Sequence, residues 1–273
     1  MASLVPPDAV DVPPEHALLV VDMKEYSQIP EAKMAPTRAD LDDILATVFA
    51  QSGIGEVAAL ESAAKDRGDG AIFVLPARHA ARLVDPFLVH LSQALGRHEQ
   101  NRLASAPPIR LRASVHAGPL EPPDHRGDAA NDACRLVDSD AARQAMAAAV
   151  DNGVPLAAAV SDMVFRRTVR AGRTPALKEQ HFQQSTARVD NKPGFKETCW
   201  LFVPGLAPAV VSPYLTDGDG AVPPGPREHT AQRGATDART DERKDGVRQK
   251  GRASGKARLV QVGRDYITGP EQS

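Results

Sequence analysis

The chain has 273 residues and a formal net charge of −2 at pH 7. This balance of charge excludes a bulk electrostatic attraction to nucleic acid or to membranes. Only two cysteines occur, which excludes a disulfide framework and fits a reducing cytosol. The start of the chain is acidic and broken by prolines, unlike a signal peptide, and no apolar stretch approaches the ~20 residues that span a bilayer. We therefore expect a soluble, cytoplasmic protein.

The spacing of apolar residues predicts the secondary structure of the first 204 residues. Five apolar residues in a row favour a buried strand, whereas apolar residues three and four apart favour helices, the first of them with Thr37 as N-cap. The expected elements in chain order are a strand at 17–21, a helix at 37–50, a hairpin of 57–65 with 71–75, a helix at 83–103, a strand at 109–115, a helix at 131–150, a strand and a short helix within 156–169, and a hairpin of 182–189 with 198–203.

These elements predict an α+β sandwich with paired strands and with helices on one face of the sheet. We expect an N-terminal leader at 1–15 and the folded domain at 16–204. Residues 205–258 are rich in Pro, Gly and charge, with few large apolar side chains, which predicts a disordered, basic linker. The linker lacks interleaved aromatic residues that stack on bases, so nucleic-acid binding is not expected. A short β-like motif ends the chain at 259–273.

Two carboxylates stand where backbone turns leave apolar strands. Asp22 directly follows the strand at 17–21, and Asp69 lies between two glycines at the tip of the first hairpin. If the two strands are neighbours, these carboxylates converge, as in sites that hold Mg²⁺ against phosphate oxygens. Taken singly, each is better explained as a turn residue.

Another pair of polar residues begins the helix at 131–150. Asn131 and Arg135 are four residues apart, so they share one helix face. An amide and a guanidinium on one face could hold a ribose oxygen and a phosphate that gains charge in a transition state. Taken alone, the pair is better explained as an N-cap and a surface arginine.

Together these segments resemble the class III nucleotidyl cyclases, the adenylyl and guanylyl cyclase family, over residues 17–202. An apolar strand followed by Asp-x-x-x-(Phe/Tyr)-(Ser/Thr) matches residues 22–27 and adds Tyr26 and Ser27 as nucleotide-binding residues. The resemblance implies a ferredoxin-like βαββαβ cyclase homology domain with extra C-terminal strands and a disordered tail. It also places Met23 with Asp22 and Asp69 in the metal site, and Asn131 and Arg135 in the catalytic role.

The resemblance assigns further nucleotide-binding residues. Lys65, four residues before Asp69, and Asp124, seven before Asn131, stand at the spacing of base-reading residues in adenine-specific members. Two departures occur. Glu25 replaces the usual glycine of the first motif, and Lys192 is near the position of the phosphate-binding lysine without matching its spacing.

Three polar residues of the strand region have plainer expected roles. Arg110 and Arg112 alternate along one strand, which favours solvated charges over phosphate contacts. His116 stands at a strand end, where a structural role is favoured. Both cysteines, Cys134 and Cys199, are expected to pack in the core.

The activity implied by the resemblance is conversion of a nucleoside triphosphate to a 3′,5′-cyclic nucleotide and pyrophosphate, with two Mg²⁺ or Mn²⁺ ions per site. Two chains would pair head to tail, so that each shared site takes its metal aspartates from one chain and its Asn/Arg pair from the other. A downstream cyclic-nucleotide receptor is implied but not identifiable. A degenerate cyclase fold that binds nucleotide and regulates a partner is the alternative.

The sequence leaves the base open. Lys65 and Asp124 favour adenine by family analogy, whereas the compact chain and its hairpin also resemble bacterial cyclases of antiphage defence that make cyclic CMP or cyclic UMP.

Overall fold

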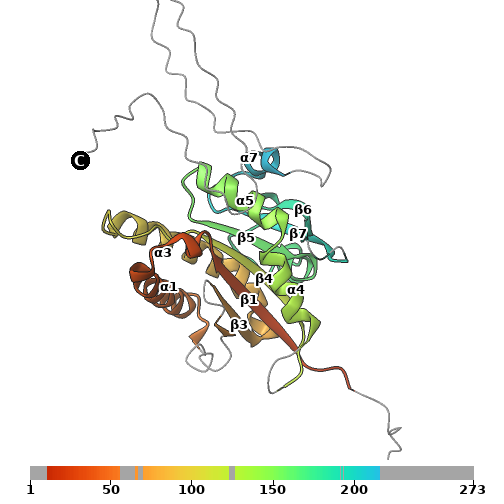
Figure 1. Ribbon diagram of the computed structural model, residues 1–273. Coiled ribbons are helices and arrows are strands. Elements are labelled where there is room, and N and C mark those ends of the chain that lie inside the picture. Colours follow the sequence, from red (N-terminus) through yellow and green to blue (C-terminus); the bar gives the residue numbers. More distant parts are fainter. Residues whose placement is uncertain are drawn as a thin grey trace, which may run out of the picture. The chain divides into compact units, whose positions relative to one another are not determined.

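The computed structural model describes residues 11–55, 65–66, 70–122, 127–190, 192 and 194–215, all in the first of two compact units, Met1–Gly225 and Pro226–Ser273. These residues form one seven-stranded sheet in the order β2-β3-β1-β4-β5-β7-β6 (Figure 1). The strands are β1 (Glu15–Met23), β2 (Lys65–Asp66), β3 (Gly70–Pro76), β4 (Leu111–Pro119), β5 (Leu156–Ser161), β6 (Gln183–Arg188) and β7 (Lys196–Phe202). The expected α+β class is therefore confirmed.

The strand β1 lies between β3 and β4 and is antiparallel to both. The strand β5 runs parallel to β4, and β7 and β6 continue the sheet as an antiparallel hairpin. Each of the expected strands within the described residues is present, and the one expected at 17–21 extends by two residues in each direction. Of the first expected hairpin, residues 57–64 lie outside the described residues, while β2 pairs with β3 as predicted.

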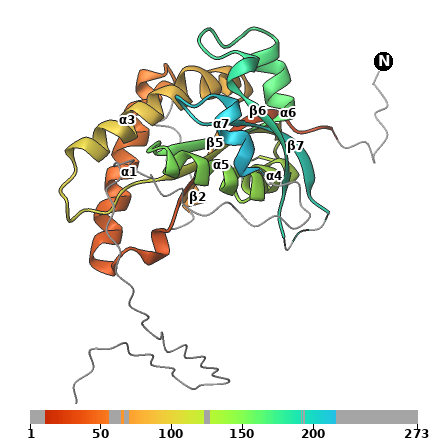
Figure 2. The same cartoon turned by 90° about the horizontal axis from the view of Figure 1, so that it is seen from above.

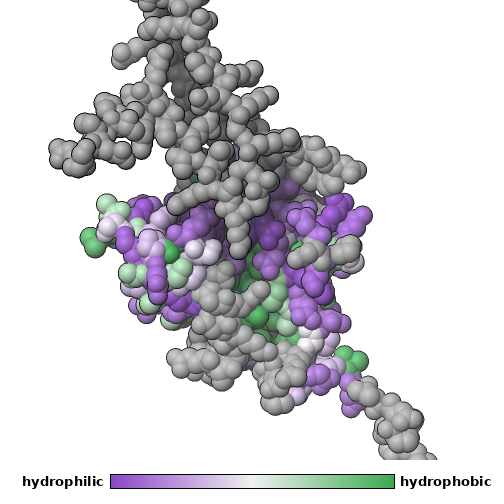
Figure 3. Space-filling view, in the orientation of Figure 1, coloured by the Kyte–Doolittle hydropathy of each residue, from purple (hydrophilic) through white to green (hydrophobic). Residues whose placement is uncertain are grey.

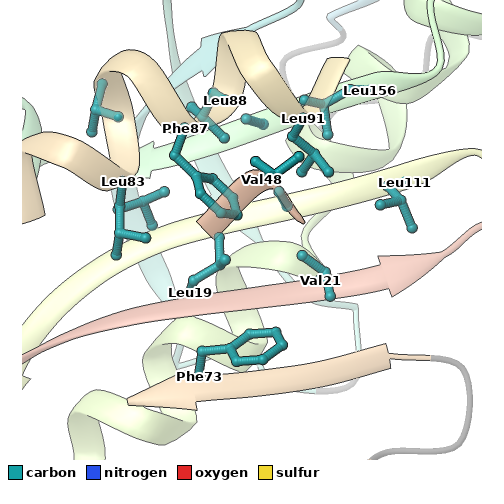
Figure 4. Packing of buried hydrophobic residues seen from close by; sticks show 14 of the residues in the cluster. Leu19, Val21, Val48, Phe73, Leu83, Phe87, Leu88, Leu91, Leu111 and Leu156 are labelled. Atoms are coloured by element: carbon teal, nitrogen blue, oxygen red, sulfur yellow. The ribbon is translucent and has the colours of Figure 1, made fainter. Parts of the chain in front are cut away.

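Helices cover both faces of the sheet, not one as expected. On one face, Leu19 and Val21 of β1 pack under α1 (Glu31–Gln51) and α3 (Leu88–Asn101), which lie side by side (Figures 2 and 4). On the other, Leu18 and Val20 pack under α4 (Asp128–Val137), and α5 (Asp140–Asp151) covers β5 to β7. The reason is in the sequence: β1 is apolar at each of residues 17–21 instead of alternating, so both of its faces need cover.

The expected helix at 37–50 begins earlier, at Glu31. Thr37 is therefore not its N-cap. It lies inside α1, where its hydroxyl Oγ1 donates to the carbonyl oxygen of Lys33 at 2.7 Å. The helix continues through Pro36, which has no N–H to donate.

Two other helices expected to be continuous are broken. In the region 83–103, Asp85 has extended backbone angles, and α3 begins only at Leu88. The Asp85 carboxylate instead accepts hydrogen bonds from the backbone N–H groups of Ala176 and Leu177. The region 131–150 is divided between α4 and α5, because Ser139 ends one helix and caps the next through its hydroxyl, which accepts from the N–H of Ala142.

The C-terminal end of the folded unit lies beyond the expected boundary at 204. A short helix α7 (Pro208–Val211) packs against α5 through the buried Val211, and the hydroxyl of Tyr214 donates to the carboxylate of Asp151 at 2.9 Å. The linker expected from residue 205 therefore cannot begin before residue 216. The remainder of that linker and the motif at 259–273 lie outside the described residues.

The remaining described helices include α2 (Ala80–Arg82) and α6 (Asp162–Phe165), which continues into a helical turn at Arg166–Arg170. Of the helices described, none combines the length and the apolar character needed to cross a membrane. Neither of the two described cysteines is in a disulfide, and burial raises the pKa of the Cys199 thiol to about 12, in keeping with the expected packing role.

Candidate functional site

The carboxylate of Asp22 lies at the end of the central strand. In the sheet register, Asp22 stands directly between Gly70 of β3 and Arg112 of β4. Its side chain is only 13% exposed and that of Arg112 only 14%. The guanidinium donates Nε to the Asp22 oxygen Oδ2 at 3.0 Å, and Nη2 contacts the same oxygen. Two charge-assisted hydrogen bonds thus converge on one carboxylate oxygen in a mostly enclosed position.

Arg112 was not among the predicted site residues, and the expectation that it is a solvated strand charge is wrong. The same expectation fails for Arg110, whose Nη1 donates to the Glu99 carboxylate at 3.3 Å with 24% of the side chain exposed. The available signal was a charged residue inside an otherwise apolar strand. Only the register of β4 against β1, which pairs residues 90 positions apart, shows which carboxylate Arg112 meets.

Gly70 brings the start of β3 unusually close to β1. A Cβ atom at this position would lie 2.1 Å from the carbonyl oxygen of Val21, so no side chain fits. Its backbone φ lies outside the left-handed range, so the close approach is what requires glycine here. Arg38 of α1 also donates Nη1 to the Gly70 carbonyl oxygen at 3.0 Å. Gly70 is thereby fixed beside Asp22, while Asp69 itself lies outside the described residues.

The turn after Asp22 contains Glu25 at the position where the resemblance leads one to expect glycine. That residue has φ 62° and ψ 23°, the left-handed conformation that favours glycine. The side chain of Met23 is buried in the core, so only its backbone could face a metal. The hydroxyl of Tyr26 donates to the carbonyl oxygen of Met34 at 3.2 Å, which gives it a structural contact, and Ser27 is exposed.

The predicted Asn131 and Arg135 lie on one face of α4, the face turned away from the sheet. Ala129, Ala133 and Val137 pack against the strands, whereas Asn131 is exposed and the Arg135 side chain is 37% exposed. Asn131 is in the first turn of the helix, which begins at Asp128 and not at Asn131 as expected. In the described contacts, Asp22 meets Arg112 of β4, whereas Arg135 meets Asp132 and Phe195.

Arg135 has two neighbours that define its surroundings. Its Nη1 donates to the carboxylate of Asp132 at 2.9 Å, and its guanidinium lies 5.8 Å from the centre of the Phe195 ring. Phe195 follows the exposed Lys192 in the β6–β7 turn, and the N–H of Phe195 donates to the carbonyl oxygen of Lys192. The turn that carries Lys192 is thus next to Arg135, which its chain spacing alone did not indicate.

The two base-reading predictions are not placed. Lys65 pairs with Ile72 through the backbone of β2, and nothing is described of its side chain. Asp124 lies outside the described residues.

A cavity of about 810 Å³ borders α4. Its lining residues include Asp132, Leu136, Phe195 and Ser161, together with His116, which lies within β4 and not at a strand end as expected. Burial lowers the pKa of His116, and the negative charge of Asp132 opposes that shift. His116 is therefore disposed to be neutral, in keeping with the structural role expected for it.

The described residues provide only part of a metal site. No cluster of three or more His, Cys, Asp or Glu side chains occurs among the residues with described positions. Asp22 nevertheless fits Mg²⁺ or Mn²⁺, which prefer oxygen ligands, because its carboxylate is enclosed at a strand end and lies beside the backbone of Gly70.

No protein-family model matches the chain, and no curated protein matches it. Similar solved structures include the adenylate/guanylate cyclase/hydrolase from Silicibacter pomeroyi, which is 22% identical over 70% of this chain and 98% of that chain, with a TM-score of 0.46. A bacterial light-regulated adenylyl cyclase is 16% identical over 74% of this chain and 98% of its own, with a TM-score of 0.45. The catalytic core of a rhodopsin-guanylyl cyclase with converted specificity, in complex with ATPalphaS, is 15% identical over 71% and 97%, with a TM-score of 0.43. These values are too low to carry a conclusion about activity.

Proposed function

We propose that this protein is a metal-dependent nucleotidyl cyclase, which converts a nucleoside triphosphate to a 3′,5′-cyclic nucleotide and pyrophosphate. The observation that carries the proposal is the enclosed Asp22 carboxylate at the end of β1, beside Gly70, the residue that follows Asp69 in the sequence. An acidic strand end of this kind suits chemistry on a triphosphate, because divalent cations link carboxylate and phosphate oxygens.

The proposed site is shared between two copies of the chain. Asn131 and Arg135 project from α4 away from the sheet that bears Asp22, so a second copy, paired head to tail, has to supply them. A symmetric pair of chains would then contain two equivalent sites. In the region of β1 and α4, Figure 3 shows an apolar area with hydrophilic surface beside it, which is a candidate contact surface.

The chemistry of the proposed site divides between the two chains. Asp22 and Asp69 of one chain would hold two Mg²⁺ or Mn²⁺ ions, which when bound would supply charge neutralisation and a lowered pKa for the ribose 3′-hydroxyl. The amide of Asn131 from the other chain orients the ribose. The guanidinium of Arg135 stabilises the negative charge that moves toward pyrophosphate, and we expect the exposed Ser27 and Lys192 to bind phosphate oxygens.

The bond changes are those of an intramolecular substitution. The ribose 3′-oxygen loses its proton to solvent and forms a bond with the α-phosphorus, while the bond from the α-phosphorus to the bridging oxygen breaks and pyrophosphate leaves. No covalent bond to the protein is needed. The protein contributes positioning and charge stabilisation.

The base and the biological role extend the proposal. Lys65 and Asp124 favour adenine by family analogy, while an antiphage enzyme would make cyclic UMP or cyclic CMP. Purified full-length protein with Mn²⁺ is incubated with ATP, GTP, CTP and UTP in turn, and products are separated by chromatography and identified by mass. We expect one cyclic nucleotide with pyrophosphate. The absence of any cyclic product from all four substrates would reject the proposal.

One observation favours the alternative, a nucleotide-binding regulatory module without catalysis. Arg112 already neutralises Asp22, as in a site that never takes a metal. The incubations with ATP, GTP, CTP and UTP distinguish the regulatory module from the cyclase by whether products form. A regulatory module binds a nucleotide tightly without converting it, whereas a cyclase releases pyrophosphate.

A further inference from the structure

The ion pair between Asp22 and Arg112 carries an inference about how the proposed metal site is controlled. Both N–H donors of Arg112 that contact Asp22 use one oxygen, Oδ2, and the Arg112 and Asp22 side chains are only 14% and 13% exposed. Solvent screens charges weakly in such a position. A divalent cation at the same carboxylate would therefore feel the repulsion of the guanidinium at close range.

The described hydrogen bonds of the Arg112 guanidinium all go to Asp22. The carboxylate of Glu99 on α3, which pairs with the other arginine of this strand region, already accepts from Arg110 and Arg102. A cation that displaced Arg112 from Asp22 would leave a partly buried guanidinium without a counter-ion, which is unfavourable.

A triphosphate removes this obstacle because it brings its own negative charge. Phosphate oxygens accept planar, paired N–H donors as well as a carboxylate does. The guanidinium could then exchange Asp22 for a phosphate oxygen, and the carboxylate would be released for the cation in the same event.

We propose that Arg112 is a built-in counter-ion of Asp22 that makes divalent-cation binding at this carboxylate conditional on the triphosphate. The inference rests on the proposed function, since it takes Asp22 as a metal ligand. It adds that the site without nucleotide repels free Mg²⁺ and Mn²⁺, and that Arg112 moves from Asp22 to a phosphate oxygen when the triphosphate binds.

The test is a titration of nucleotide-free, full-length protein with Mn²⁺, followed by the electron paramagnetic resonance signal of the free ion. Arg112→Gln should bind Mn²⁺ roughly tenfold or more tightly than the wild type, because one positive charge next to the ligand is removed. Arg112→Lys keeps the charge and should stay close to the wild type. The double variant Asp22→Asn with Arg112→Gln should lose the gain, which shows that Asp22 is the ligand.

Arg110→Gln is the matched control. It removes an arginine from the neighbouring position that pairs with Glu99 instead of Asp22, so its Mn²⁺ affinity should equal that of the wild type. Circular dichroism confirms that each variant is folded, and Arg112→Lys keeps the comparison usable if Arg112→Gln unfolds, since its Mn²⁺ affinity must not rise. Equal or weaker Mn²⁺ binding by folded Arg112→Gln would overturn the proposal.

The Mn²⁺ titration does not depend on whether the protein forms a cyclic nucleotide. Tighter binding by Arg112→Gln together with no cyclic product from the wild type would reject the cyclase function and keep the counter-ion. Cyclic product from the wild type without tighter binding by the variant would reject the counter-ion and keep the cyclase.

Discussion

The end of β1 and the outer face of α4 carry the two halves of the proposed site. They differ in how far their charged and polar side chains find partners within one chain. At the strand end, Asp22 and Arg112 satisfy each other's charge away from solvent. On α4, Asn131 is exposed and Arg135 has one acidic partner at the surface. The strand end thus contributes to the stability of the single chain, whereas the helix face keeps its polar groups accessible to something outside the chain.

The largest expected effect comes from breaking the strand-end pair. Asp22→Ala should abolish cyclic-nucleotide formation and lower the free energy of unfolding by about 3 kcal/mol, because Arg112 is left as an enclosed charge without a partner. Urea denaturation measures the second effect. Adding Arg112→Ala to Asp22→Ala should restore part of the stability and none of the activity. A double variant less stable than Asp22→Ala would contradict this account of the pair.

Substitutions on the outer face of α4 should lower activity and leave stability almost unchanged. Asn131→Ala and Arg135→Ala should each lower the rate of cyclic-nucleotide formation by about 10²-fold or more, since each removes a donor used in the transition state. Their unfolding free energies should change by no more than about 0.5 kcal/mol, because both side chains are at the surface. Arg143→Ala, at an exposed position on α5, is the control and should leave both quantities unchanged. Unfolding of Arg135→Ala would show that the helix face is structural.

The sequence predicted the strands well where the signal was local. The apolar run of β1, the alternation of β4 and the β6–β7 hairpin are all present, and Asn131 and Arg135 share the expected helix face. Helix ends were harder, because Ser139 both ends α4 and caps α5 within what looked like one helical repeat. Thr37 was misplaced because helix formation extends through Pro36.

The partners of the site residues could not be predicted. Which side chain faces Asp22 depends on the register between β1 and β4, and which backbone carbonyl Arg38 reaches depends on how α1 crosses β3. Both contacts join distant parts of the chain, whereas motif spacing reports only residues that are close in sequence.

A smaller effect is expected in the turn that connects Asp22 to α1. Glu25→Gly should raise the unfolding free energy by about 0.5–1 kcal/mol, because glycine takes the left-handed conformation without strain. Glu25→Ala removes the same side-chain ion pair with Lys24 but keeps a Cβ atom, so it should give no gain. Urea denaturation of the three proteins provides the measurement. A gain from Glu25→Ala equal to that from glycine would assign the effect to the ion pair.

The smallest effect concerns pH and the α4 side of the sheet. Burial lowers the pKa of His116 below its ordinary value of 6.5, so the unfolded chain binds this proton more readily than the native one. Stability from this residue is therefore complete above 6.5 and is lost as the pH falls below it. The decrease in the free energy of unfolding between about pH 7.5 and about pH 5.5, measured by urea denaturation, should be smaller for His116→Gln than for the wild type. Identical pH dependence in both proteins would show that His116 is not the group responsible.

The measurement that tests the central claim most directly mixes two inactive proteins. Asp22→Asn and Arg135→Ala are purified separately, assayed alone and then assayed as an equal mixture under conditions that allow subunits to exchange. In a head-to-tail pair, each mixed dimer has one site with both Asp22 and Arg135 intact, so the mixture should recover about one quarter of the wild-type rate of cyclic-nucleotide formation. A mixture as inactive as its components, in the presence of demonstrated subunit exchange and an active wild type, would contradict a site shared between two chains.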